Sequence, residues 1–196
     1  MNEALIVSNL VLWVVVLALL VAVFALARQV GILHERVAPM GALMMDHGPK
    51  VGTASPVFTL TDLAGRPVNI GAPSLSSTLL FFLSPTCPVC KKLLPIVKST
   101  AASERRWLSI VLASDGDEVE QRKFIRRAGL EAFPYVLSTN LGVTYHVSKL
   151  PYAVLLDERG IVRAKGLVNS REQLESLFTA KDLGVASIQD FVDQRP

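Results

Sequence analysis

Hydrophobic and polar positions divide the chain into an apolar N-terminal run and a longer part in which the two alternate. Residues 4–27, ALIVSNLVLWVVVLALLVAVFALA, contain no charged side chain. A helix of this length is roughly 36 Å long, because each residue adds about 1.5 Å, and it can cross a hydrocarbon layer of about 30 Å. Residues 4–27 are therefore predicted to form a transmembrane anchor.

A cleavable signal peptide is the alternative interpretation of the same run. Ala25-Leu26-Ala27 resembles a small-residue cleavage site. The run is nevertheless longer than the usual apolar region of a signal peptide, and no Lys or Arg precedes it. We favour an uncleaved, single-pass anchor, followed by a linker over residues 28–55 and a folded domain over residues 56–196.

The predicted linker is rich in Gly, Pro and Met, which favours an irregular segment. Its Met40, Met44, Met45 and His47 are residue types that bind soft metals. Methionine more often fills apolar gaps, so we expect these methionines to pack against protein or to lie near the bilayer surface.

The rest of the chain alternates between short apolar runs of strand length and segments with helical spacing. Strands are predicted for two runs within 57–70 joined by a turn at Gly65, for 79–83, 108–113 and 135–137, and for a hairpin over 153–167 that turns near Arg159-Gly160. Helices are predicted for 88–103, 115–128 and about 141–147, and for a last segment capped by Ser170. This order is typical of an α/β sheet with right-handed crossovers between parallel strands and an antiparallel hairpin near the end.

Charge and cysteine content exclude some functional classes. All 20 basic residues and 16 of the 17 acidic ones follow the apolar run, so that part carries a formal charge of +4, which does not indicate nucleic-acid binding. The basic residues of 115–128 are predicted to form a solvated face stabilised by pairs such as Glu118–Arg122. With two cysteines, a framework of several disulfides is excluded.

The two cysteines stand three positions apart in SPTCPVCKKLLP, between a predicted buried strand and a predicted helix. Pro88 suits the first helical position, because its missing N–H would have no intrahelical partner there. Cys87 then lies at the helix N-terminus, where unpaired N–H groups and the helix dipole favour a thiolate. Cys90 lies one turn inside, within disulfide reach at a Cα separation of about 5.5 Å. The placement predicts a redox-active pair in which Cys87 attacks and Cys90 resolves.

Metal binding is the alternative use of the pair. Half of a zinc site is disfavoured, because no further cysteine exists and His34, His47 and His146 are scattered. A copper chaperone would need a histidine beside the two cysteines, and His146 is the candidate within the domain. We expect His146 to be a half-buried helix residue instead, and we expect neither a resident metal nor a cofactor.

Three features of the chain resemble the thioredoxin fold: a C-x-x-C pair that opens a helix, Pro95 eight residues after Cys87, and the Leu150-Pro151 bond ahead of the terminal hairpin. The resemblance implies that Pro95 marks a helix kink. It also implies that Pro151 follows a cis bond beside the dithiol. Leu150 and Pro151 would then contact the substrate, and the intervening Pro88-Val89 would tune the redox potential.

Two positions depart from the thioredoxin pattern. Thr86 stands where many relatives have Trp, and Phe81 stands where thioredoxins have a buried acid. Without that acid, no evident group accepts the proton of Cys90 in a reducing cycle, so a reductase is disfavoured and an oxidase or an isomerase stays open. Pro88-Val89 also lacks the His of strongly oxidising relatives, so extreme oxidising power is not implied.

The segment VGTASPVFTLTDLAGRPVNI resembles membrane-tethered, TlpA-type members of this fold. Together with the apolar run, MMDHGP, SPTCPVCKKLLP and LGVASIQDF, it is similar to the MauD family of methylamine dehydrogenase accessory proteins. The resemblance implies a thiol-disulfide oxidoreductase that forms or corrects disulfides in the methylamine dehydrogenase small subunit and that has a further membrane or periplasmic redox partner. A thiol reductase for cytochrome c maturation remains an alternative.

Two arguments place the domain on different sides of the inner membrane. Arg28, Arg36 and Lys50 follow the apolar run, so the positive-inside rule would place the domain in the cytoplasm. The family resemblance implies the periplasm. We favour the periplasm, because the flanking bias is only a few residues and a catalyst of disulfide formation belongs in an oxidising compartment.

Overall fold

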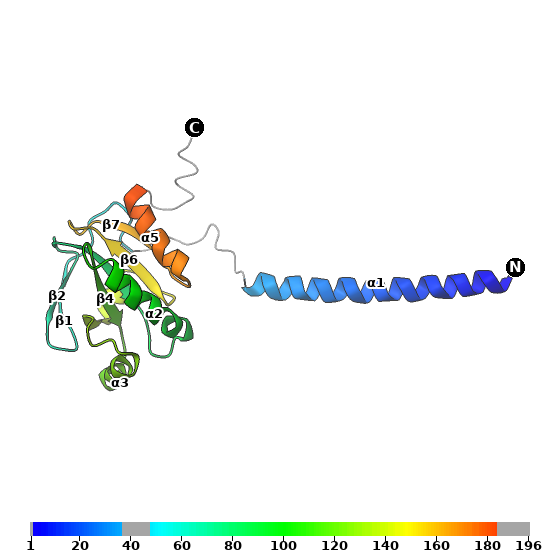
Figure 1. The fold of residues 1–196 in the computed structure, drawn as a ribbon, viewed down its shortest axis with the longest axis horizontal. Helices are drawn as coiled ribbons and strands as arrows, with labels where there is room; N and C mark the ends of the chain where they lie inside the picture. Colours follow the sequence, from blue (N-terminus) through cyan, green and yellow to red (C-terminus); the bar gives the residue numbers. More distant parts are fainter. Residues whose placement is uncertain (1, 37–47, 184–196) are drawn as a thin grey trace. The chain divides into compact units, whose positions relative to one another are not determined.

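The computed structural model describes residues 2–36 and 48–183, and the chain divides into two units, residues 1–45 and 46–196. In the first unit, helix α1 spans Asn2–Arg36 (Figure 1). Its segment Leu5–Phe24 is 20 residues long, with a mean hydropathy of 2.8, and its side chains are exposed. An N-terminal apolar helix is thus present, and its length and composition fit both a membrane anchor and a signal sequence.

The helix continues beyond the predicted anchor, because residues 28–36 of the predicted linker are helical. The four candidate metal ligands of that linker, Met40, Met44, Met45 and His47, lie outside the described residues. The LGVASIQDF segment is described only as far as Leu183.

The second unit is built on a five-stranded sheet with the order β5-β4-β3-β6-β7. Its strands are β3 (Ser77–Phe82), β4 (Leu108–Ser114), β5 (Tyr135–Leu137), β6 (Tyr152–Leu156) and β7 (Val162–Leu167). Strand β4 is parallel to β3 and to β5, whereas β6 runs antiparallel to β3 and to β7. The predicted α/β sheet and its terminal hairpin are confirmed.

Strand β3 is apolar on both sides because it lies at the centre of this sheet. Its alternate residues Leu79 and Phe81 join one hydrophobic cluster, and Leu80 and Phe82 join the other. Side chains along a strand point alternately to opposite faces, so a strand covered on both faces appears as a continuous apolar run. This explains why LLFFL marks the sheet centre in the sequence.

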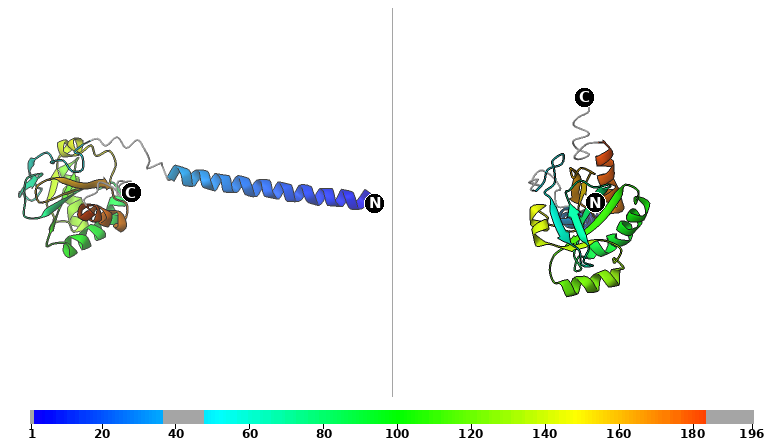
Figure 2. Two further views of the ribbon diagram at one scale, coloured as in Figure 1. Left: turned by 90° about the horizontal axis from the view of Figure 1, so that it is seen from above. Right: turned by 90° about the vertical axis from the view of Figure 1, so that its left-hand side faces the viewer.

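Helices cover both faces of the sheet (Figure 2). They are α2 (Pro88–Ser103), α3 (Glu118–Ala128), α4 (Thr139–Thr144) and α5 (Arg171–Leu183). Side chains of α2, α3 and α5 pack into the first cluster, and Leu141 of α4 packs into the second. The helix that begins with Pro88 therefore lies on the face to which Phe81 points.

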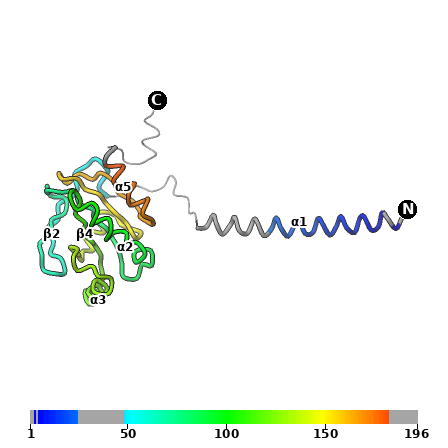
Figure 3. The backbone as a smooth tube through the Cα atoms, in the orientation of Figure 1, coloured from blue at the N-terminus to red at the C-terminus, as the bar shows by residue number. Residues whose placement is uncertain are grey.

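A two-stranded sheet leads into the main one, as the trace in Figure 3 shows. Its strands, β1 (Phe58–Thr61) and β2 (Pro67–Ile70), are antiparallel and are joined by a turn that includes Gly65, whose φ is 80°. The preceding segment is tied to the β6–β7 hairpin by a bridge between Ala54 and Ile161. The predicted strand pair and its turn are therefore confirmed.

Two helices differ in their bounds from the prediction, and local caps explain both cases. Helix α3 begins at Glu118 rather than at 115, because the Asp117 side chain accepts a hydrogen bond from the backbone N–H of Glu120 (3.0 Å). Helix α4 begins at Thr139 rather than at 141 and ends at Thr144, and Ser138 caps it by accepting from Leu141 N–H (3.1 Å). Gly129 ends α3 with a φ of 60°, as predicted.

The expectation that His146 is a half-buried helix residue is wrong. Helix α4 ends before it, with Tyr145 as the C-cap. His146 is exposed and has a φ of 52° in the left-handed region. The helix ends here because His146 is left-handed: its N–H bonds to the Val143 carbonyl (3.0 Å), and the next N–H, of Val147, bonds to the Gly142 carbonyl (2.9 Å).

Asp157 organises the turn between β6 and β7. Its carboxylate accepts hydrogen bonds from the backbone N–H groups of Arg159 (2.9 Å) and Ile161 (2.8 Å), and it forms an ion pair with Arg163 (2.7 Å). Burial alone would raise the pKa of Asp157, but these hydrogen bonds and the Arg163 charge lower it below its usual value. The charged form therefore stabilises the folded state.

Replacing Asp157 by Asn should lower the free energy of unfolding by about 2 kcal/mol at neutral pH, because hydrogen bonds to a charged group are lost. Since folding lowers the pKa of Asp157, its contribution is present above the unfolded pKa of about 4 and is lost as pH falls through the folded value. Urea unfolding of the full chain in detergent, followed by near-UV circular dichroism, measures the free energy of unfolding. The difference in this free energy between wild type and variant should become smaller in acid.

Arg159 provides a matched control for this prediction. Its side chain is 76% exposed and lies 3.7 Å from the Asp157 carboxylate. An exposed pair of this kind contributes little, so Arg159→Gln should change the free energy of unfolding by less than about 0.5 kcal/mol. Equal losses of unfolding free energy in the two variants would contradict the assigned role of Asp157. So would a difference between wild type and Asp157→Asn that does not change with pH.

Candidate dithiol active site

A tight turn carries the chain from the end of β3 to the start of α2. Ser84 organises this turn: its carbonyl accepts from Cys87 N–H (3.1 Å), and its hydroxyl accepts from Thr86 N–H (3.3 Å). The hydroxyls of Ser84 and Thr86 also lie 2.9 Å apart. Sequence reasoning missed Ser84, which stands three residues before the helix cap, although Ser is a frequent turn residue. The turn fixes where Cys87 meets the helix.

Cys87 is the N-cap residue of α2, as its place before Pro88 predicts. Its backbone is extended (φ −80°, ψ 113°), and its Sγ accepts a hydrogen bond from Cys90 N–H (3.1 Å). Oxygen-bearing side chains usually hold this position, where they satisfy an unpaired N–H of the first turn. A sulfur here meets a donor and the positive end of a 16-residue helix, which favours a thiolate over a thiol once the pair is reduced.

Cys87 and Cys90 form a disulfide with a Cα separation of 5.3 Å. The predicted i, i+3 reach is therefore confirmed. The two sulfurs differ in environment, because Cys87 is half-buried whereas Cys90 is fully buried on the inner side of α2. An incoming thiolate can approach the more exposed Cys87, and Cys90 is shielded. This geometry suits attack through Cys87 and resolution through Cys90.

Phe81 makes the space behind the pair apolar. Its side chain is fully buried in the cluster that also holds Cys90. Within residues 48–183, the buried carboxylates are Asp62 and Asp157, and both form ion pairs with arginine. No carboxylate of the described part of the chain is therefore buried with Cys90, as the absence of an acid at position 81 predicts.

The Leu150-Pro151 bond is cis, as the resemblance to thioredoxins implies. Strands β3 and β6 are antiparallel with Phe82 opposite Tyr152, so the start of β6 lies at the sheet edge where β3 ends and the dithiol turn begins. Pro151 is buried, whereas Leu150 is half-buried and packs with Cys87 against one hydrophobic cluster. The structure thus brings the predicted substrate-contacting pair and the dithiol to one edge of the sheet.

The backbone at this edge is partly available for binding. The Pro151 carbonyl accepts a hydrogen bond from Val168 N–H (3.1 Å). Among the residues described, Leu150 has no hydrogen bond on its backbone N–H or its carbonyl. An extended segment of another protein can pair with such free groups as an added strand.

Pro88 and Val89 separate the two cysteines and lie at the surface. Both are exposed, and Val89 has 36% of its surface accessible. Neither side chain carries a charge or a hydrogen-bond donor. Neither residue therefore competes with the helix N-terminus, which stays the main electrostatic influence on Cys87. Their predicted redox-tuning role consists of adding nothing to that influence.

A cavity of about 310 Å³ adjoins the Leu150 edge. It is lined by Leu83 and Leu150 and by polar side chains. Ser114 and Ser138 come from the ends of β4 and β5, and Lys149 comes from the loop before β6. Sequence reasoning missed these polar residues, because they lie far apart in the sequence and no local motif joins them. Only the rule that strand ends gather at one edge of an α/β sheet could have indicated them.

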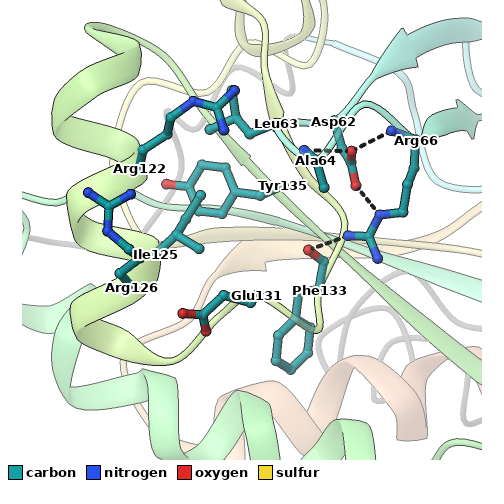
Figure 4. A pocket seen from close by; sticks show the side chains of 10 residues that line it. All are labelled: Asp62, Leu63, Ala64, Arg66, Arg122, Ile125, Arg126, Glu131, Phe133 and Tyr135. Carbon is teal, nitrogen blue, oxygen red and sulfur yellow. Dashed lines mark hydrogen bonds and ion pairs between the residues drawn. The ribbon is translucent and has the colours of Figure 1, made fainter.

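Another cavity, of about 230 Å³, lies between the β1–β2 turn and α3 (Figure 4). At its rim, Arg66 bonds to the Asp62 carboxylate (2.6 Å) and to the Phe133 carbonyl (3.1 Å). Tyr135 is buried in the wall, and its hydroxyl donates to Gln121 Oε1 (2.6 Å). These groups are paired within the protein and neither cysteine reaches this cavity, so we assign it no part in the dithiol chemistry.

The described residues offer no cluster of three or more His, Cys, Asp or Glu side chains that could hold a metal ion. The sequence candidate His146 follows α4, which packs on the face of the sheet opposite α2. The structure therefore does not bring His146 and the two cysteines into one ligand set.

Comparisons with known proteins agree with this geometry. Residues 50–181 match the Redoxin family. The chain is 48% identical over 191 residues to the methylamine utilization protein MauD of Paracoccus versutus, covering 97% of this chain and 96% of that protein. It is 49% identical to MauD of Methylorubrum extorquens, covering 98% and 94%. The crystal structure of StoA from Bacillus subtilis aligns with a TM-score of 0.55 at 25% identity, covering 65% of this chain and 98% of StoA. The predicted thioredoxin-like fold is confirmed.

Proposed function

The chain belongs to the Redoxin family and, within it, to the MauD methylamine utilization proteins, and from this premise we propose that it is a membrane-tethered thiol-disulfide oxidoreductase that forms or corrects disulfides in the methylamine dehydrogenase small subunit. The observation that carries the proposal is a half-buried Cys87 at a helix N-terminus in a disulfide with a fully buried Cys90. The relatives' name gives methylamine utilization, and the small subunit as client is what the family resemblance implies.

In the oxidising direction, a client thiolate attacks Cys87 Sγ, and Cys90 leaves as the thiolate. A second client thiolate then attacks the client sulfur of the mixed disulfide, so a client disulfide forms and Cys87 leaves. The helix N-terminus stabilises the departing Cys87 thiolate, which favours this second step. The enzyme ends as a dithiol and needs a redox partner to oxidise it again.

In isomerisation, the reduced enzyme begins the exchange. The Cys87 thiolate attacks a non-native client disulfide and forms a mixed disulfide, and a client thiolate later displaces Cys87 to give the native pairing. Leu150 can hold the client as an added strand through its free N–H and carbonyl groups. No net redox change occurs within this cycle, so the redox partner is needed only to keep the Cys87–Cys90 pair reduced.

The proposed location is the inner membrane, with α1 as a single-pass anchor and the dithiol unit in the periplasm. The length and hydropathy of Leu5–Phe24 support the anchor, and the redox chemistry supports the compartment. An alkaline phosphatase fusion after the last residue tests this topology, because that reporter needs an oxidising compartment. An inactive phosphatase fusion beside an active cytoplasmic reporter would place the dithiol in the cytoplasm.

The proposed activity is tested by producing the methylamine dehydrogenase small subunit with and without this chain in one periplasm. Alkylation of free thiols, read by mass spectrometry, counts native, non-native and missing disulfides. We expect missing or mispaired disulfides without the chain and native pairing when it is restored. Identical disulfide patterns in both strains would overturn the proposed client.

A separate prediction distinguishes thiol exchange from copper delivery. His146→Ala should leave disulfide reduction and isomerisation within about twofold of wild type, because the residue is exposed and lies beyond α4, on the other face of the sheet from α2. Insulin reduction and refolding of a scrambled disulfide protein measure it. A large loss of exchange together with a loss of bound Cu(I) would favour the chaperone.

A further inference from the structure

A second groove lies beside the dithiol, between α2 and α3. It has a volume of about 490 Å³ and is named here the α2–α3 groove. The residues that define it are Thr86, Lys91, Leu94, Pro95, Phe124 and Arg127. None of them lines the cavity at the Leu150 edge. The dithiol therefore has two distinct surfaces beside it.

The groove is continuous with the attacking cysteine. Thr86 at its end directly precedes Cys87 in the chain. On α2, Lys91, Pro95 and Lys98 follow Cys87 at spacings of 4, 8 and 11 residues, which places them on one side of a helix. A segment lying along this side reaches Cys87 at one end.

The groove has an apolar floor. Leu94 and Phe124 are nearly buried, with 6% and 8% of their surfaces accessible, and Pro95 is exposed beside them. These side chains come from the facing sides of two helices. A partner can therefore bury an apolar side chain between α2 and α3.

The rim of the groove is positively charged. Lys91, Lys98 and Arg127 face a single acid, Glu120, which is already paired with Lys123 (2.7 Å). Lys98 donates to the Ala128 carbonyl at the end of α3. Lys91 and Arg127 are exposed and have no ion-pair partner among the residues that the structure describes.

The sequence predicts the basic residues of α3 to be a solvated face, and this holds for Arg122, Lys123 and Arg126, which lie outside the groove. Arg122 pairs with Glu118 (2.7 Å) and Lys123 with Glu120 (2.7 Å) along the helix surface. Arg127 differs, because it lines the groove across from Lys91 on α2. The positive charge of Lys91 and Arg127 therefore lies beside the apolar floor of the groove, on the side of α2 that leads to Cys87.

We propose that the α2–α3 groove docks an acidic segment of a protein partner that also carries an apolar side chain, and that it presents the cysteine of that segment to Cys87. The inference rests on the proposed thiol-disulfide exchange. A dithiol enzyme exchanges with two proteins in turn, a client and a redox partner. The Leu150 edge and the α2–α3 groove provide a separate surface for each of these two proteins. Charge complementarity favours the protein with the acidic segment at the positively charged groove.

The test uses reduced full-length protein in detergent and two synthetic peptides. Each peptide has one cysteine beside a Leu, flanked by Glu in one peptide and by Lys in the other, and activated as a mixed disulfide with thionitrobenzoate. Cys87 thiolate attacks the peptide sulfur and releases thionitrobenzoate, the better leaving group. Cys90 then attacks Cys87 Sγ, forms the Cys87–Cys90 disulfide and releases the peptide thiol. Each turnover thus oxidises one enzyme dithiol and reduces one mixed disulfide.

Wild type should react with the acidic peptide about tenfold faster than with the basic one at low ionic strength, and salt should reduce this preference. The double variant Lys91→Glu/Arg127→Glu should lose or reverse the preference. The matched control Lys92→Glu/Arg126→Glu makes the same charge change on exposed positions of the same helices outside the groove. It should keep most of the preference.

A neutral small disulfide, hydroxyethyl disulfide, separates the possible failures. If wild type does not react with it, the proposed function fails. If wild type reacts with it but shows no charge preference between the peptides, the groove proposal alone is overturned. Equal losses in the groove variant and its control would also overturn it, because net charge rather than the groove would then steer the peptides. Rates with the neutral disulfide also correct for any direct effect of Lys91→Glu on Cys87.

Discussion

Cys87→Ser is expected to abolish thiol-disulfide exchange, whereas Cys90→Ser is expected to accumulate a mixed disulfide with the client. The first variant lacks the sulfur that an incoming thiol or disulfide can reach, because Cys90 is fully buried on the inner side of α2. The second retains the half-buried Cys87 at the helix N-terminus but lacks the thiol that resolves the intermediate. The loss in Cys87→Ser should exceed about 10³-fold, since Cys90 is the one other cysteine of the sequence and is fully buried.

Non-reducing gels of cells that produce each variant measure this difference. Cys90→Ser should give high-molecular-weight adducts that disappear on reduction, and mass spectrometry of these adducts identifies the client. Cys87→Ser and the double cysteine variant should give none. Adducts on Cys87→Ser but not on Cys90→Ser would reverse the assigned roles.

The adduct experiment also tests the proposed client independently of the assigned roles. If the Cys90→Ser adduct contains the methylamine dehydrogenase small subunit, the client is supported. If it contains a cytochrome or a cytochrome maturation protein, the reductase alternative gains support. The half-buried Cys87 will react with whichever protein its surroundings recruit, so the trapped partner reports on the surfaces beside the dithiol.

The dithiol could be predicted from the sequence because its physics is local. Pro88 fixes the helix start, the apolar run that ends at Leu83 fixes the strand before it, and the spacing of Cys87 and Cys90 fixes the disulfide reach. Each of these depends on neighbours within a few residues. The apolar run at 79–83 likewise marked the sheet centre, since only a strand covered on both faces has no polar side.

The surroundings of the dithiol could not be predicted in this way. Phe124 and Arg127 meet Lys91 only because α2 and α3 pack side by side, and no pattern within either helix contains that information. For His146, by contrast, a prediction was made from the sequence and was wrong. It was predicted within a helix over about 141–147, but its own left-handed backbone (φ 52°) ends α4 before it, with its N–H on the Val143 carbonyl (3.0 Å). Caps decide helix bounds through single hydrogen bonds, to which hydrophobic periodicity is not sensitive.

The redox couple is expected to be more oxidising than the thioredoxin value of about −270 mV. The helix N-terminus and the hydrogen bond from Cys90 N–H stabilise the Cys87 thiolate, and stabilising the thiolate stabilises the reduced form of the pair. The buried Phe81 provides no base to help Cys90 attack and release a reduced client. Both effects favour a chain that accepts electrons from its client.

Pro88 and Val89 set the upper limit of this potential. They bring no charge or donor to Cys87, so the couple should stay below the roughly −120 mV of the strongest oxidants. Val89→His should raise the potential by about 30 mV, because a cation two positions after Cys87, within the same first turn of α2, further stabilises the thiolate by about 1.4 kcal/mol. The matched control is Val119→His, since Val119 is exposed in the first turn of α3 and does not lie on the helix that carries Cys87.

Equilibration of each protein with glutathione buffers, read by alkylation of the free thiols, gives these potentials. We expect wild type between the two reference values, Val89→His above it and Val119→His unchanged. A wild-type potential at or below that of thioredoxin would show that the helix N-terminus does not determine the direction of the reaction. The chain would then act as a reductant toward its client, and the cytochrome c maturation alternative would become the better account of its function.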